Sequence, residues 1–340
     1  MTQEEAAPIG LTWRVYVERL AANSGGFTAL AEALMRAAGD GAALPADLLS
    51  VEKGIRRLVR RGNASGGQYG RWLLRYMGLP EDAERWARWL AQYHRRSTDL
   101  PLRLRLEQLQ TWERPPFGES RLASWTQVGL ASVHMRLEGA ERAREHLDRA
   151  RAGAAKAGAA CVSEVALLDA YNAANDRRYD EARLCLDTAQ RAAHDASVDA
   201  EDRACLDARV VAQHAYLLTK PLHGQPDAAA FSEAQRLFEN IPQSTEHAFV
   251  AFRKCNGLAY CAWKLGDRAR GLALAREACT HAGDGGFVRF RVLALTMIAR
   301  MLEDPVLARA TQQRAARLAR SLDDEDLFLK ATKWLESATS

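Results

Sequence analysis

The chain has 340 residues, of which 48% are hydrophobic and 26% are charged, and its formal net charge is +4. These values are typical of a folded globular protein and exclude a disordered or low-complexity chain. No apolar run reaches the roughly 18 residues that a membrane span requires, and the acidic N-terminus lacks the basic-then-apolar order of a secretory signal. The cysteines form no C-x-x-C pair, which favours reduced, buried thiols. The sequence therefore predicts a cytoplasmic protein without membrane association.

The positive charge is concentrated in the first third of the chain. Residues 1–118 contain 17 Lys and Arg against 13 Asp and Glu, whereas residues 119–340 contain 30 of each kind. The segment Arg114-Pro115-Pro116-Phe117-Gly118 has the composition of a linker. We therefore predict two domains, a basic one over 1–118 and a neutral one over 119–340, with different electrostatic roles.

The first region is expected to contain only helices, because each stretch with apolar residues at helical spacing ends at or near Gly or Pro. The predicted helices cover residues 11–22, 27–38, 45–61, 69–77, 81–96 and 100–112. On the fifth of them, Trp86, Trp89, Leu90 and Tyr93 form an apolar stripe. This stripe is expected to pack against the second region, and a partner-binding surface is the alternative.

The third of these helices carries five basic residues on one face, opposite the apolar residues Val51, Ile55 and Leu58. The basic residues, at positions i, i+3, i+4, i+7 and i+8, are Lys53, Arg56, Arg57, Arg60 and Arg61. Like charges at this spacing repel each other, so the face is suited to a polyanion such as a nucleic-acid backbone. The alternative is a solvated basic face that is neutralised by carboxylates from elsewhere in the fold.

Residues 27–80 resemble the phage-repressor-like helix-turn-helix family. The resemblance rests on Ile55-Arg56-Arg57-Leu58-Val59-Arg60-Arg61-Gly62, followed by a helix that opens at Tyr69 and ends in Gly78-Leu79-Pro80. It implies that the helix over 47–61 lies in the major groove, where its Arg residues contact phosphates or guanine edges. It also implies a homodimer, since such domains bind two-fold symmetric DNA sites.

The second region is expected to form helix pairs joined by short turns, with a capping helix at 326–338. The predicted pairs are 120–137 with 140–156, 162–175 with 179–194, 201–219 with 229–240, 246–265 with 267–281, and 287–302 with 305–320.

One pattern of small and large residues recurs in three of these pairs. It consists of Ala131, Ala143, Leu147 and Ala150, then Ala170, Ala182, Leu186 and Ala189, then Ala259, Gly271, Ala275 and Ala278. Such units let two helices approach closely and bury their apolar faces only by stacking on each other. With Gly257-Leu258-Ala259 before Leu265-Gly266-Asp267, the pattern resembles the tetratricopeptide repeat family. The resemblance implies an all-α fold: a helix-turn-helix-like domain, then a tetratricopeptide-like α-solenoid of about five helix pairs.

That family binds peptides or proteins in the concave groove lined by the first helix of each pair. Basic and amide groups there would clamp peptide carboxylates or backbone, and an aromatic ring would anchor an apolar side chain. The alternative is that the rings pack against adjacent helices. The candidate groove residues are Tyr171, Asn175, Arg253, Asn256, Tyr260, Trp263 and Lys264.

The sequence shows no catalytic or metal-binding motif. Its histidines lack metal-ligand spacing, and no phosphate-loop or nucleophile motif occurs in a strand–turn–helix context. We therefore expect no enzyme activity, cofactor or metal. The prediction is a DNA-binding transcription regulator whose groove binds a peptide or protein. The main alternative is a protein–protein interaction adaptor with a degenerate N-terminal domain that does not bind DNA, and RNA binding by the basic face is a third reading.

Overall fold

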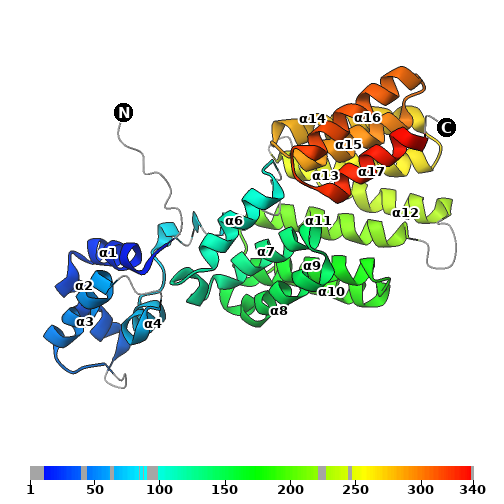
Figure 1. Cartoon of the computed structure of the whole chain (residues 1–340). Coiled ribbons are helices and arrows are strands. Elements are labelled where there is room, and N and C mark those ends of the chain that lie inside the picture. Colours follow the sequence, from blue (N-terminus) through cyan, green and yellow to red (C-terminus); the bar gives the residue numbers. More distant parts are fainter. Residues whose placement is uncertain are drawn as a thin grey trace.

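The computed structural model describes residues 11–39, 44–61, 65–83, 85–86, 88–89, 99–220, 227–243 and 247–337. All regular secondary structure in these residues is helical, and no strand occurs among them (Figure 1). The prediction of an all-α protein is confirmed. None of the helices in these ranges is both long and apolar enough to cross a bilayer.

Four helices form an N-terminal group: α1 (Trp13–Ser24), α2 (Phe27–Ala38), α3 (Leu48–Arg61) and α4 (Gly67–Tyr76). The helix α3 packs against the other three, and its apolar stripe of Val51, Ile55 and Leu58 is buried. A Cβ atom on Gly54 would lie 2.1 Å from the ring of Tyr69. The helices α3 and α4 therefore come this close only because α3 has no side chain at that position.

The second group begins with α6 (Leu102–Glu113) and ends with α17 (Glu325–Ser337). Between them lie η1 (Phe117–Glu119), α7 (Ala123–Leu137), α8 (Ala140–Ala157), α9 (Ala159–Asn175), α10 (Tyr179–Ala193), α11 (Ala200–Leu218), α12 (Ala228–Glu239), α13 (Ala248–Lys264), α14 (Arg268–Asp284), α15 (Val288–Met301) and α16 (Pro305–Arg320). From α7 onward each helix packs against the next, and α7, α9, α11, α13 and α15 also contact one another in that order. These bounds agree with the predicted helix pairs to within three residues.

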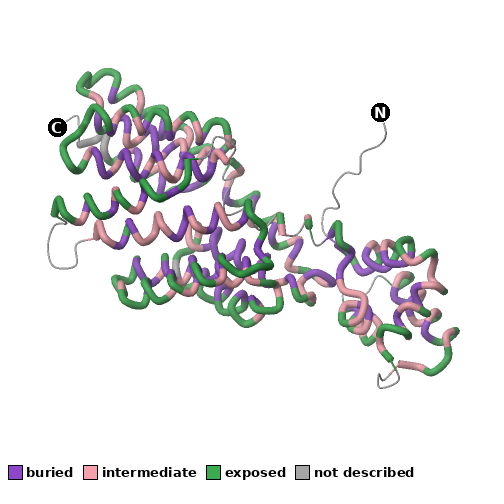
Figure 2. The backbone as a smooth tube through the Cα atoms, turned by 180° about the vertical axis from the view of Figure 1, so that it is seen from behind, coloured by how far each residue is buried: buried purple, intermediate pink, exposed green. Residues whose placement is uncertain are grey.

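Small residues set the distance within these hairpins. The pattern residues Ala131 and Ala143 of α7 and α8 are fully buried, as is Ala182 of α10. In α13 and α14 the approach is closer, since a Cβ atom on Gly271 would lie 3.1 Å from the carbonyl oxygen of Ala259. Figure 2 shows the resulting distribution, with buried residues on the helix sides that face neighbours and exposed residues outside.

The helix α6 packs with the second group, although the sequence placed it with the first. It contacts α7 and η1, and Phe117 of η1 is fully buried against Trp112, with ring centroids 5.2 Å apart. Residues 114–118, expected to be a linker, are therefore part of a packed corner. The reason is that the apolar side of α6, including Leu102 and Leu109, is covered by α7.

The two ends of the second group meet. The amide of Leu102 at the start of α6 donates to the carbonyl oxygen of Leu322 in the turn before α17, at 2.9 Å. The helix α17 also contacts α7. We call this junction of α6 and α7 with the C-terminal helices the seam.

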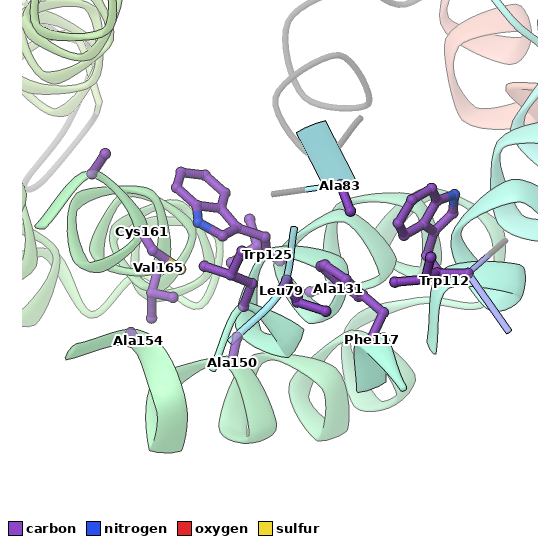
Figure 3. Packing of buried hydrophobic residues seen from close by; sticks show 14 of the residues in the cluster. Leu79, Ala83, Trp112, Phe117, Trp125, Ala131, Ala150, Ala154, Cys161 and Val165 are labelled. Atoms are coloured by element: carbon purple, nitrogen blue, oxygen red, sulfur yellow. The ribbon is translucent and has the colours of Figure 1, made fainter. Parts of the chain in front are cut away.

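A single apolar core joins the N-terminal group to the second one. Leu79 and Ala83, which follow α4, are buried with Trp112, Phe117 and Trp125 (Figure 3). The hydroxyl of Tyr16 in α1 donates to the carbonyl oxygen of Gly78 at 2.7 Å, which fixes the same segment to the first group.

The predicted helix over 81–96 lies partly outside the described residues, among them Leu90 and Tyr93. Its described part is helical, and Trp86 packs against the shared core, as the predicted apolar stripe requires. Trp89 is 47% exposed and stacks on Trp86 at 4.6 Å. The stripe therefore packs inward at one of these two Trp residues and faces solvent at the other.

Candidate functional site

A cavity of about 740 Å³ lies within the second group, between α7, α9, α11, α13, α15 and α17. Alternate helices line it because they contact one another and turn their inner sides to the same space. Its volume falls within the range of ordinary ligand pockets. We refer to it as the pocket.

Equivalent positions of the repeated pattern line the pocket. One residue after the first small residue of each pattern come Ser132, Tyr171 and Tyr260, and four residues after it come Met135, Ala174 and Trp263; all six line the pocket. These two positions are three residues apart, so both lie on the same side of a helix. The pattern that sets the helix spacing therefore also sets which side chains face the pocket.

Five of the seven candidate groove residues line the pocket: Tyr171, Arg253, Asn256, Tyr260 and Trp263. The other two, Asn175 and Lys264, are exposed and do not line it. Each is the last residue of its helix, α9 or α13. The ammonium of Lys264 lies over the ring of Trp263, 4.7 Å from its centre.

The predicted aromatic residues lie in the pocket wall and also pack against their neighbours. Tyr260 contacts Phe231 of α12 with ring centroids 5.9 Å apart, and Trp263 lies 6.3 Å from Tyr260. Tyr171 is 42% exposed. These rings therefore line the pocket and also pack against neighbouring side chains, and their role in binding stays a prediction.

The pocket wall is strongly basic. Its cationic side chains are Arg136, Arg209, Lys220, Arg253, Arg289, Arg300 and Lys330, and its one carboxylate is Asp326. Three of the cations have carboxylate partners among the described residues: Arg209 with Glu164 at 2.5 Å, Arg289 with Asp324 at 3.3 Å, and Lys330 with Asp326 at 2.5 Å. For Arg136, Lys220 and Arg300 no described carboxylate lies within ion-pair distance. The pocket therefore has an excess of positive charge.

The basic face of α3 is largely open to solvent. Lys53, Arg57, Arg60 and Arg61 are exposed, and none forms an ion pair with a carboxylate of the described residues. Arg56 differs, since its Nε donates to Glu52 at 2.7 Å. Its guanidinium also lies 4.6 Å from the centre of the Phe27 ring of α2.

The contacts of Arg56 tie α3 to α2. Glu52 accepts a second hydrogen bond from Thr28 of α2 at 3.0 Å, and the bonds from Arg56 and Thr28 lower the pKa of Glu52. Of the five predicted residues, four therefore present free charge and Arg56 is held against its own domain.

No protein-family model matches this chain, and no curated protein matches it significantly. The two family resemblances therefore stay predictions.

Three possible metal ligands come together on α13 and α14. The thiol of Cys255, a carboxylate oxygen of Glu277 and a ring nitrogen of His281 all lie within 4.8 Å of one another. Burial, followed by the charge of Glu277 and a hydrogen bond to it, raises the pKa of the Cys255 thiol to about 12. The thiol therefore keeps its proton at neutral pH and donates a hydrogen bond to Glu277, whereas a metal ligand would have to be the thiolate.

Sequence reasoning missed most of the basic pocket residues and the metal-ligand trio. Arg136 lies on α7, Lys220 follows α11, and Arg289 and Arg300 lie at opposite ends of α15, so they share no local spacing. Only the alignment of the repeated pattern gave a usable signal, because it identifies Ser132 as equivalent to Tyr171.

Proposed function

We propose that the protein is a DNA-binding transcription regulator. In this proposal α1–α4 form a helix-turn-helix-like domain, and the second group is a tetratricopeptide-like α-solenoid whose pocket binds a peptide or protein ligand. The observation that carries the proposal is the lining of one basic, aromatic pocket by equivalent positions of the repeated pattern. A wall with unpaired cations and exposed rings suits a peptide with acidic and apolar groups.

The face of α3 supports the DNA-binding part of the proposal. Its four exposed cations have no described carboxylate partner, so they are available to phosphates. The helix is also fixed in orientation, through Gly54 against α4 and through Arg56 and Glu52 against α2. A rigid helix with an open basic face is what major-groove binding requires.

The segment after α4 offers a physical link between the two functions. Arg88 pairs with Asp199 at 3.1 Å and also with Asp202, both at the start of α11. The other end of α11 lines the pocket through Gln213 and Tyr216. A ligand that shifts α11 would therefore displace the segment that positions the N-terminal group.

Fluorescence anisotropy tests the DNA-binding part. The full chain is titrated against fragmented genomic DNA at several salt concentrations. We expect the logarithm of affinity to fall linearly with the logarithm of salt concentration, with a slope of roughly 0.9 per phosphate contacted. The variant R57A/R60A/R61A is expected to lose most of that slope.

A matched control has the same charge change elsewhere. Arg309, Arg314 and Arg317 of α16 are exposed, and R309A/R314A/R317A should keep the wild-type slope. An equal loss in both variants would assign the binding to net charge rather than to α3. Absence of DNA binding at low salt would reject the proposal.

The second candidate function is an adaptor that does not bind DNA. The observation that favours it is the engagement of Arg56 by Glu52 and Phe27, which removes one predicted contact from the basic face. The same titration separates the two functions, because an adaptor gives no salt-dependent DNA binding.

A further inference from the structure

The seam brings together charged groups from four segments that are far apart in the sequence. Arg105 lies on α6, Arg136 near the end of α7, Arg289 near the start of α15, and Asp324 just before α17. The positive charges of Arg289 and Arg105 destabilise the protonated form of Arg136, and the negative charge of Asp324 stabilises it. Arg289 and Asp324 are joined at 3.3 Å.

Within this cluster Arg136 has a buried donor atom without a hydrogen-bond partner. That atom is Nη1, and none of the described carboxylates forms an ion pair with Arg136. Burial of its guanidinium, and then the neighbouring charges of Arg289 and Arg105, lower the pKa of Arg136 well below its ordinary value. A buried guanidinium with an unsatisfied donor beside a second guanidinium costs stability, and an anion bound to it would offset that cost.

Two arginines of this cluster are placed where a ligand in the pocket would lie. Arg136 and Arg289 both line the pocket, so both guanidinium groups belong to its wall. Tyr171 of α9 also lines the pocket and lies within electrostatic reach of Arg136. Guanidinium groups bind a carboxylate or a phosphate with paired hydrogen bonds, which gives both strength and orientation.

We propose that Arg136 and Arg289 form a binding site for one oxyanion, a carboxylate or a phosphate, at the seam where the first and last helices of the second group meet. This site lies in the pocket of the proposed function. Only the identity of the molecule that carries the oxyanion rests on that function. The rest of that molecule would lie along the pocket towards Tyr260 and Trp263.

A bound oxyanion would also brace the seam. It would join α7 to α15 through two guanidinium groups from opposite ends of the second group. The hydrogen bond from Leu102 to Leu322 lies at the same junction, and its opening would become rarer when the two ends are held together. Binding of an oxyanion would therefore also stabilise the contact between the two ends of the second group.

Thermal unfolding of the full chain tests the binding site. The probes are inorganic phosphate and tricarballylate, each compared with NaCl at the same ionic strength. We expect Tm to rise by roughly 3–6 °C, relative to NaCl, at a probe concentration about tenfold above Kd. A larger rise with tricarballylate assigns the site to carboxylates, and a larger rise with phosphate assigns it to phosphates. No rise with either probe would overturn the proposal.

The variant R136M keeps an unbranched apolar stem and removes the charge and the donors. It should lose the rise in Tm that the probes cause, while its Tm in NaCl should equal or exceed that of the wild type. The control R309M changes an exposed arginine of α16 and should keep the rise. A lower Tm in NaCl with the rise retained would make Arg136 a structural residue and reject the site.

A second variant covers the case in which R136M does not fold. R136K keeps the charge but loses the paired donors, and its affinity for the effective probe should fall at least tenfold. Wild-type affinity in R136K would show that paired hydrogen bonds are not made there, contrary to the proposal.

Hydrogen exchange tests the seam itself. Exchange at the amide of Leu102 should slow when the probe is bound to the wild type and not when it is added to R136M. An unchanged rate in the wild type would reject the bracing. DNA binding is measured separately, with the probes absent: its failure would remove the proposed function and leave the rise in Tm in place.

Discussion

The basic residues of α3 and those of the pocket are the same residue types in opposite surroundings. On α3, Lys53, Arg57 and Arg60 are exposed and have no described carboxylate partner. In the pocket, Arg209 is 7% exposed and paired with Glu164. Hydrated cations attract any polyanion and are screened by salt, whereas buried cations need a fixed partner. The surroundings, more than the number of charges, therefore distinguish a surface for an extended polyanion from a pocket for a compact anion.

The largest effect is expected at the buried pair of the pocket. R209M leaves the carboxylate of Glu164, which is 1% exposed, without its 2.5 Å ion-pair partner. The free energy of unfolding should fall by about 3–5 kcal/mol, measured by urea denaturation. The double variant R209M/E164L should recover most of the loss, because it leaves no buried charge. If R209M does not change the free energy of unfolding, buried cations do not depend on a fixed partner as argued above.

A smaller effect on the free energy of unfolding is expected from His146, a buried residue that is neutral in the folded protein at neutral pH. Its Nδ1 atom lies 2.7 Å from an oxygen of Gln127, and its ring stacks on His134. Burial, followed by the charge of His134, lowers the pKa of His146 to about 4, against about 6.5 in an unfolded chain.

Between these two pKa values the unfolded state of His146 binds a proton that the folded state does not. The contribution to stability is therefore complete above about pH 6.5 and is lost as the pH falls towards 4, by roughly 3 kcal/mol at most. Urea denaturation at about pH 7 and about pH 4.5 should show this loss in the wild type and a smaller one in H146Q. Equal losses would contradict the role of His146.

The next effect concerns the support of the basic face. G54A adds a methyl group that would lie 2.1 Å from the Tyr69 ring, and overpacking of this kind costs about 1–3 kcal/mol. The gain in helix propensity, about 1 kcal/mol, offsets only part of it. Denaturation should therefore show a net loss, and DNA affinity should fall with it because α3 is displaced. In a Y69A background the same substitution should stabilise, and a loss there would exclude the clash as the cause.

The smallest effect is expected at Lys264, which the sequence assigned to the groove and the structure places outside the pocket. K264A should change the free energy of unfolding by no more than about 0.5 kcal/mol. It should also leave the rise in Tm with phosphate and tricarballylate unchanged. A lost rise would mean that the pocket extends to the end of α13.

Helix positions were predictable because they depend on local signals. Gly25 and Gly26 end α1, and Asp304 with Pro305 begins α16, where the Asp304 side chain accepts from the amides of Val306 and Leu307. Spacing of apolar residues gave the rest of each helix. The helix predicted to begin at residue 69 starts two residues earlier, at Gly67.

The site was only partly predictable. Tyr171, Asn256 and Tyr260 were found because their positions in the repeated pattern determine which side of the helix they occupy. Arg136 and Arg289 were not found, since nothing in their local sequence shows that the end of α7 and the start of α15 reach the same pocket. Local spacing likewise did not show that α6 packs against α7.

The sequence by itself determined the all-α class, the helix bounds and the close hairpins, because these depend on spacing, capping and small residues within a few turns of the chain. The tertiary structure decided which arginines are exposed and which are buried, where the two ends of the second group meet, and which side chains share the pocket. These properties depend on desolvation and on contacts between residues distant in sequence, such as Leu102 with Leu322, and neither is encoded in local spacing.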